Sequence, residues 1–232
     1  MTARRPPSSA GPTEAERPPG VLLVLTGSAG TTTPWGALVT AVAEVLGVDV
    51  AVEPTVPGDH STPGWTDAVI RRAADAEGPV LVLPAATDAD AVTRPERVLR
   101  RVLAPFDTSD EVSWSIGPLL QGLEAAGVEI DQLHVTSSAS VPGMWEGSGH
   151  HAQAWRAELL RRHQVGSAAV EVTGGTPAVA VAARAGQADL VVLCWVGSTA
   201  GGRSRNVRAV LRAVEVPVLL LGRRSPGAPA ET

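Results

Sequence analysis

Four short polar stretches could bind an anionic ligand, because each follows an apolar run and supplies glycine, hydroxyl or carboxylate groups. They read PFDTS, HVTSS, TGGTP and CWVGS, at residues 105–109, 134–138, 173–177 and 194–198. Glycines expose backbone N–H groups and hydroxyls donate hydrogen bonds, so such stretches can cradle a phosphate. Turns favour the same residue types, so composition alone does not separate a ligand site from ordinary turns.

The elements that would position these stretches form an α/β pattern. From residue 21 onward, apolar runs alternate with segments of helical periodicity in a βαβα order, which predicts a parallel sheet with helices on both faces. Ligands of open parallel sheets bind in the crevice beyond the carboxyl ends of the strands. The four polar stretches fall at those ends, so the sequence predicts a ligand crevice there.

We expect two α/β units in this chain. Residues 20–86 hold three apolar runs and two helical patterns, which predict a βαβαβ unit too short for most independent doubly wound domains. Residues 97–222 hold five predicted strands with intervening helices, enough for a complete α/β sandwich. The polar, proline-rich ends, 1–19 and 223–232, are predicted to be disordered, and residues 87–96 to be a linker.

Composition excludes several classes of function. A formal net charge of -5 argues against general nucleic-acid binding, which needs a basic surface. The single cysteine, Cys194, excludes an internal disulfide and a CxxC zinc site. No apolar run approaches the ~20 residues that cross a bilayer, and the N-terminus lacks the apolar core of a secretory signal. We therefore expect a cytoplasmic protein with no nucleic-acid or membrane partner.

Five motifs, in order and at matching spacing, make residues 97–222 similar to the universal stress protein family. They are RRVLAPFDTSDEV at 100–112, LHV at 133–135, GTP at 175–177, ADLVVLC at 188–194 and VLRAVEVPVLLL at 210–221. The resemblance implies a parallel-sheet α/β sandwich of the adenine nucleotide alpha hydrolase-like type. It also implies ATP or another adenine nucleotide as the ligand.

The resemblance assigns positions in a nucleotide site. Asp107 would contact the adenine or ribose end, the backbone at Val135 would line the adenine pocket, and a glycine loop after the strand near 190–195 would hold the phosphates. The residues assigned to this site are Pro105, Asp107, Thr108, Val135, Gly175, Gly197, Ser198, Ser204, Arg205 and Asn206. No catalytic residue and no metal ligand is assigned.

The predicted phosphate loop departs from the family pattern, which has glycines three apart, nine further residues, and then Gly-Ser or Gly-Thr. Cys194 occupies the first glycine position and Gly197 the second, while Ser204 and Arg205 fall where the last pair belongs, after only six residues. A shorter loop with a side chain at its first position should wrap a triphosphate less completely. Ser204 could compensate by capping the last helix, and Arg205 and Arg208 by adding positive charge.

The N-terminal unit allows two interpretations. It could be a degenerate universal stress protein repeat, which would make the chain an internal pseudo-dimer. It is also weakly similar to half of a sirohydrochlorin or cobalt chelatase, with Thr26, Gly27 and Ser28 where that family has His-Gly-Ser. A threonine hydroxyl does not replace the metal-handling imidazole, and we favour the repeat.

The sequence therefore predicts a non-catalytic, ligand-binding or regulatory protein of the stress response rather than an enzyme, as a homodimer or internal pseudo-dimer. One alternative is a chelatase-like protein that handles tetrapyrroles or metals. Another is a purely structural interaction module, whose strand VPVLLL at 216–221 pairs at a sheet edge or dimer interface. His150 and His151 begin a predicted helix over 150–163, and we interpret them as a solvated helix start rather than as metal ligands.

Overall fold

The computed structural model describes residues 21–26, 35–54, 62–76, 78–84, 98–106, 110–136, 170–195 and 202–222. The strands in these ranges are β1 (Val21–Thr26), β2 (Asp49–Pro54), β3 (Val80–Leu83), β4 (Arg101–Phe106), β5 (Glu129–Thr136), β6 (Val170–Gly174), β7 (Leu190–Trp195) and β8 (Val218–Gly222). The helices are α1 (Gly36–Leu46), α2 (Trp65–Asp75), α4 (Asp110–Ala125), α6 (Pro177–Ala185) and α7 (Gly202–Ala213). Each strand and helix lies where the sequence predicts one, although α4 and α7 begin a few residues earlier than expected. The helix predicted over 150–163 lies outside the described residues.

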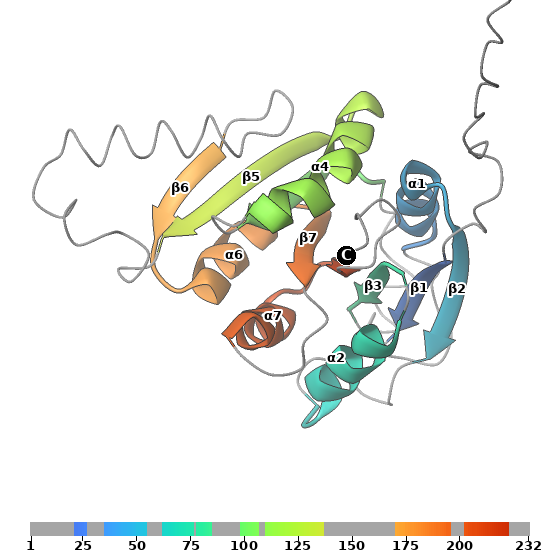
Figure 1. The fold of residues 1–232 in the computed structure, drawn as a ribbon, viewed down its shortest axis with the longest axis horizontal. Helices are drawn as coiled ribbons and strands as arrows, with labels where there is room; N and C mark the ends of the chain where they lie inside the picture. Colours follow the sequence, from blue (N-terminus) through green and yellow to red (C-terminus); the bar gives the residue numbers. More distant parts are fainter. Residues whose placement is uncertain are drawn as a thin grey trace, which may run out of the picture.

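The strands form one eight-stranded sheet in the order β2-β1-β3-β8-β7-β4-β5-β6 (Figure 1). Neighbouring strands are parallel except at the pairing of β3 with β8, where Val80 lies opposite Leu220 and Val82 opposite Val218. We call β2, β1 and β3 the N-terminal half-sheet, and β8, β7, β4, β5 and β6 the C-terminal half-sheet. The sheet is therefore two parallel half-sheets joined antiparallel, which the expectation of a purely parallel sheet did not include.

Helices cover both faces of this sheet, as Figure 1 shows: α1 and α4 lie on one face, and α2, α6 and α7 on the other. The strands explain why, because their apolar residues alternate between the two layers. In β1, Leu22 and Val24 join the core beneath α1 and α4, whereas Leu23 and Leu25 join the core beneath α2, α6 and α7. Strands that are apolar on both sides are typical of parallel sheets buried between helix layers.

Both core layers run across the antiparallel junction. On one face α2 packs against α7, and on the other α1 packs against α4. The α1–α4 contact is close at Gly122, where an added Cβ would lie 2.8 Å from Val45 Cγ1. The two predicted units therefore share one sheet and continuous cores, while their predicted boundary near 87–96 lies outside the described residues.

The position of β8 corrects one expectation. The interaction-module alternative required VPVLLL to pair at a sheet edge or with another molecule. The structure instead places β8 in the interior of the sheet, between β3 and β7 of the same chain. Its side chains from Val218 to Leu221 are buried, because core layers cover them on both faces.

Candidate ligand site at the carboxyl edge of the C-terminal half-sheet

In the C-terminal half-sheet, the order in which the chain adds strands changes side between β4 and β7. From β4 it proceeds outward through β5 to β6, and it then returns to β7 on the other side of β4. Such a topological switch point leaves a crevice outside the carboxyl ends of the two central strands. Here the crevice is expected where β4 ends at Phe106 and β7 ends at Trp195.

The backbone pairing supports an opening at this point. The registered pairs between β4 and β7 are Val102 with Leu190 and Leu103 with Val191. β4 continues for three residues beyond these pairs and β7 for four. By contrast, β4 pairs with β5 along its whole length, as far as Phe106 opposite His134.

The described site residues lie at this same edge. Pro105 occupies the penultimate position of β4, opposite Leu133, and Val135 occupies the penultimate position of β5, opposite Thr173. Both side chains are half-buried. Asp107, Thr108, Gly197 and Ser198 lie outside the described residues, so their part in the site remains a prediction.

Gly175 lies between β6 and α6 and has a backbone conformation that favours glycine. Its φ is +124°, a value that side chains with a Cβ rarely adopt. Thr176 follows in an extended conformation, and Pro177 begins α6, the position where proline fits a helix best. The GTP motif therefore makes a sharp entry into a helix that begins at the carboxyl edge.

The first turn of α7 carries Ser204, Arg205 and Asn206. The helix begins at Gly202, so Ser204 lies inside the first turn, and the expectation that it caps the helix from outside is wrong. Its side chain is buried, whereas Arg205 and Asn206 are exposed. The first turn contains no acidic residue, which suits an anion near the positive end of a helix dipole.

Arg208 is directed elsewhere. Its Nε donates a hydrogen bond to Asp67 Oδ1 of α2 at 2.9 Å. The expectation that this arginine adds charge to the phosphate loop is therefore corrected. It connects α7 with the N-terminal half of the molecule.

Sequence reasoning missed the role of Asp189 in the ADL motif. Its Oδ2 accepts hydrogen bonds from the backbone N–H groups of Arg100 and Arg101, each at 2.9 Å, and its own N–H donates to the Arg101 carbonyl. These bonds join the amino ends of β4 and β7, at the edge opposite the crevice. The motif thus joins the amino ends of the two strands that flank the switch point.

The bidentate ion pairs that the structure places on the sheet also lie away from the crevice. Arg72 of α2 donates to both carboxylate oxygens of Glu53 at 2.7 and 2.6 Å, and these bonds lower the pKa of Glu53. Arg101 pairs with Glu129 at the amino ends of β4 and β5, and this contact raises the pKa of Arg101. Neither pair lies at the carboxyl ends of β4 and β7, so neither belongs to the candidate ligand site.

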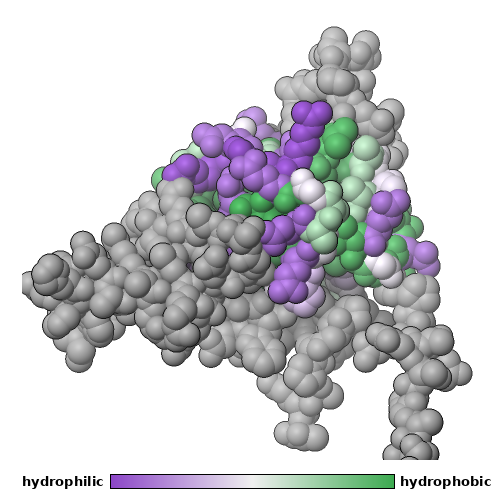
Figure 2. Space-filling model, turned by 90° about the horizontal axis from the view of Figure 1, so that it is seen from above, coloured by the Kyte–Doolittle hydropathy of each residue, from purple (hydrophilic) through white to green (hydrophobic). Residues whose placement is uncertain are grey.

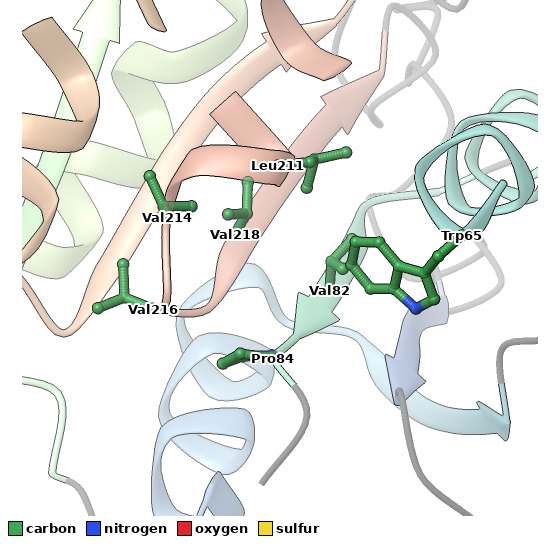
Figure 3. Close-up of a pocket in the computed structure, with 7 residues that line it drawn as sticks. All are labelled: Trp65, Val82, Pro84, Leu211, Val214, Val216 and Val218. Carbon is green, nitrogen blue, oxygen red and sulfur yellow. The ribbon is translucent and has the colours of Figure 1, made fainter. Parts of the chain in front are cut away.

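A small apolar pocket lies at the junction of the half-sheets (Figure 3). It is lined by Trp65, Val82, Pro84, Leu211, Val214, Val216 and Val218. Ligand sites combine apolar walls with a few convergent polar groups. In Figure 3 the indole nitrogen of Trp65 lies on the side of the ring turned away from Val214 and Val216. The pocket is therefore a packing gap beneath α2 and α7.

The described residues also bear on a reactive cysteine, a metal site and a membrane-spanning helix. Cys194 lies within β7, opposite Leu221, and is partly buried. Among the described ranges, no three histidine, cysteine or acidic side chains gather as a metal site would need. Glu146, His150 and His151 lie outside those ranges. None of the helices described is long and apolar enough to span a bilayer.

Comparisons with known proteins find similarity in structure only. No protein-family model and no curated protein matches the sequence. A functionally unknown protein of Pseudomonas aeruginosa PAO1 is similar with a TM-score of 0.50 and 15% identity, over 88% of this chain and 82% of that one. A putative universal stress protein of Pseudomonas aeruginosa UCBPP-PA14 is similar with a TM-score of 0.50 and 16% identity, over 87% of this chain and 82% of that one.

The extent of these similarities bears on the N-terminal unit. A match over 88% of the chain cannot be contained in residues 97–222 alone, so it includes strands of both half-sheets. The solved structures named above lend no support to the chelatase-like alternative. The predicted α/β architecture is confirmed, and the chain has the fold of the universal stress proteins.

Proposed function

We propose that this chain is a member of the universal stress protein family that binds an adenine nucleotide without catalysing a reaction on it. The observation that carries the proposal is the switch point between β4 and β7, whose registered pairing ends before their carboxyl ends. The segments that follow these two strands in the sequence contain Asp107 and Thr108, and Gly197 and Ser198. These are the residues to which the family resemblance assigns the nucleotide.

The described residues supply a surface suited to such a ligand. Half-buried Pro105 and Val135 offer apolar contacts for a base at the ends of β4 and β5. Exposed Arg205 and Asn206 offer donors in the first turn of α7, where backbone N–H groups attract anions. Cys194 lies inside β7 and Arg208 is bonded to Asp67, so few groups are left to bind the phosphates. We therefore expect this chain to bind nucleotide more weakly than family members with the full glycine loop.

The antiparallel junction of the half-sheets supports the interpretation of the chain as an internal pseudo-dimer. On either side of the junction the strands run parallel and are covered by helices on both faces. We propose that the N-terminal half-sheet is a shortened repeat that supports the C-terminal half. A role in the stress response in the cytoplasm follows from family membership and forms part of the same proposal.

The test is thermal unfolding and calorimetric titration of the full chain with ATP. A ligand at 100 times its dissociation constant stabilises the folded state by about 2.7 kcal/mol, which raises the melting temperature measurably. Asp107→Ala should remove the shift, while Asp75→Ala, an exposed carboxylate on α2, should retain it. Absence of any shift at millimolar ATP, or an equal shift in Asp107→Ala, would contradict the proposed site.

A further inference from the structure

The open edge of the N-terminal half-sheet has a surface that the ligand site does not explain. β2 is the outermost strand on this side of the sheet, with β1 as its neighbour. At the other end of the sheet, β6 is the outermost strand described. Among the strands described, none lies outside β2. Open edges can pair with another strand, and proteins usually protect them with charges or proline.

The centre of this edge is apolar. Val50 and Val52 are 43% and 45% exposed, although valine is a residue that sheets usually bury. They pair with Leu22 and Val24 of β1, whose side chains lie in the core beneath α1. Both exposed valines therefore lie on the α1 face of the sheet, at its rim. Charged Asp49 and Glu53 lie only toward the ends of the strand.

Helix α1 extends the apolar surface. Of its eleven residues, all described, only Thr40 and Glu44 are exposed, while Ala37, Ala41, Val45 and Leu46 are partly exposed. Figure 2 shows apolar surface on the right-hand side of the view, the side on which α1 and β2 lie, interrupted by a few hydrophilic residues. Apolar surface beside an open strand edge is typical of an interaction surface.

We propose that a second copy of this chain covers this edge, with the two β2 strands paired antiparallel about a two-fold axis. Val50 and Val52 of β2, with the partly buried Val48 directly before the strand, form a row that is complementary to itself. With Val50 opposite Val50 of the second copy, Val48 of each copy lies opposite Val52 of the other. Three valine pairs then form on the α1 face, and β-branched cross-strand pairs stabilise a sheet.

The charges agree with this register. On the other face, Asp49 lies opposite Ala51 of the second copy, so no two carboxylates are directly opposed. Glu53 is already paired with Arg72 in its own chain at 2.6 Å. Two-fold dimers are the commonest symmetric assemblies of soluble proteins. The short strand pair, supplemented by α1, makes a small interface, and we expect a dissociation constant on the order of 10 μM.

Sedimentation equilibrium of the full chain across this concentration range tests the inference. The wild type should change from monomer to dimer, and Val52→Lys should raise the dissociation constant by at least about tenfold, because it places charge in the valine pairs. Val179→Lys changes the same residue type at a 68% exposed position on α6 and should dimerise like the wild type. Both valines are exposed in the monomer, and melting temperatures close to the wild type confirm that the variants fold.

Three outcomes overturn the inference: a strictly monomeric wild type, a dimer that Val52→Lys leaves intact, or equal dissociation by Val179→Lys. The chain could also stay monomeric while an added peptide strand protects the β2 amides from hydrogen exchange. Such a result would assign the edge to another protein. That result also rejects the second copy. None of these outcomes depends on whether the chain binds nucleotide.

Discussion

Arg208 on α7 donates a hydrogen bond of 2.9 Å to Asp67 on α2, although 141 residues separate them in the sequence. The bond joins the C-terminal half of the molecule to the N-terminal half on the face where α2 packs against α7. Because α7 begins at the carboxyl edge of the proposed ligand site, this contact links that site to the N-terminal half-sheet. It is one of several features through which the two halves stabilise each other.

Breaking this ion pair should weaken the fold slightly. The two side chains are 27% and 45% exposed, so solvent screens their interaction, and a double-mutant cycle of Arg208→Gln and Asp67→Asn should give a coupling of about 0.2–1 kcal/mol. Urea denaturation at low and high salt measures it, and the coupling should shrink at high salt. Arg212→Gln on the exposed side of α7, combined with Asp67→Asn, provides the control and should show no coupling.

Trp65, the first residue of α2, should contribute strongly to the junction, because it is 3% exposed and lines the same pocket as Leu211 of α7. Trp65→Ala should lower the free energy of unfolding by ~3–5 kcal/mol. Trp65→Phe should lose less, because it keeps an aromatic ring and removes an indole N–H that has no hydrogen-bond partner within the described residues. Equal losses in both variants would indicate that ring packing does not explain the role of Trp65.

Two glycines of α4 should respond oppositely to alanine. A Cβ on Gly117 meets nothing within 4 Å outside its chain neighbours, and alanine favours helix over glycine by about 0.5–1 kcal/mol. Because Gly117 precedes Pro118 in the helix, and proline crowds a Cβ on the residue before it, Gly117→Ala should raise the free energy of unfolding by less than this amount. In Gly122→Ala the new methyl would lie 2.8 Å from Val45 Cγ1 of α1, which should cancel or reverse that gain. Adding Val45→Ala to Gly122→Ala should relieve the contact, and the double-mutant cycle should show a favourable coupling. Equal stabilisation by both glycine variants would contradict the close α1–α4 approach.

Asp189 should matter for stability rather than for ligand binding. Asp189→Ala removes the acceptor of the Arg100 and Arg101 backbone N–H groups, and we expect a loss of about 1 kcal/mol. Asp189→Asn keeps an acceptor oxygen and should lose less. Chemical denaturation compares the three proteins. If an Asp189 variant as stable as the wild type bound nucleotide with a different affinity, this assignment would be contradicted.

The Glu53–Arg72 pair predicts a pH-dependent difference. Hydrogen bonds from Arg72 lower the pKa of Glu53 in the folded state below its usual 4.5. The stabilisation is therefore fully present above the unfolded pKa of Glu53 and disappears as the pH falls through its lowered folded value. At pH 7 Glu53→Gln should melt slightly below the wild type, and the difference should vanish in strong acid. Arg72→Gln should behave in the same way, and a difference that persists unchanged in acid would contradict this explanation.

The sequence alone determined the elements of this protein and their class. Apolar runs such as 21–26 and 190–195 predict strands buried on both faces, and the βαβα order predicts helices between them. These signals are local, so they can be read from the order of residues. The position of polar stretches at strand ends also directed attention to the carboxyl edge, where Pro105 and Val135 lie.

Only the tertiary structure decided how distant segments meet. The antiparallel pairing of β3 with β8 joins residues more than a hundred positions apart, and both strands are uniformly apolar, so periodicity does not reveal their partners. For the same reason, the sequence VPVLLL does not distinguish an edge strand from the interior strand that it forms beside β3. The partner of Arg208 on α2 and the backbone contacts of Asp189 likewise depend on packing. Hydrophobic pattern fixes which face of an element is buried, whereas side-chain fit and hydrogen-bond geometry fix which element lies next to it.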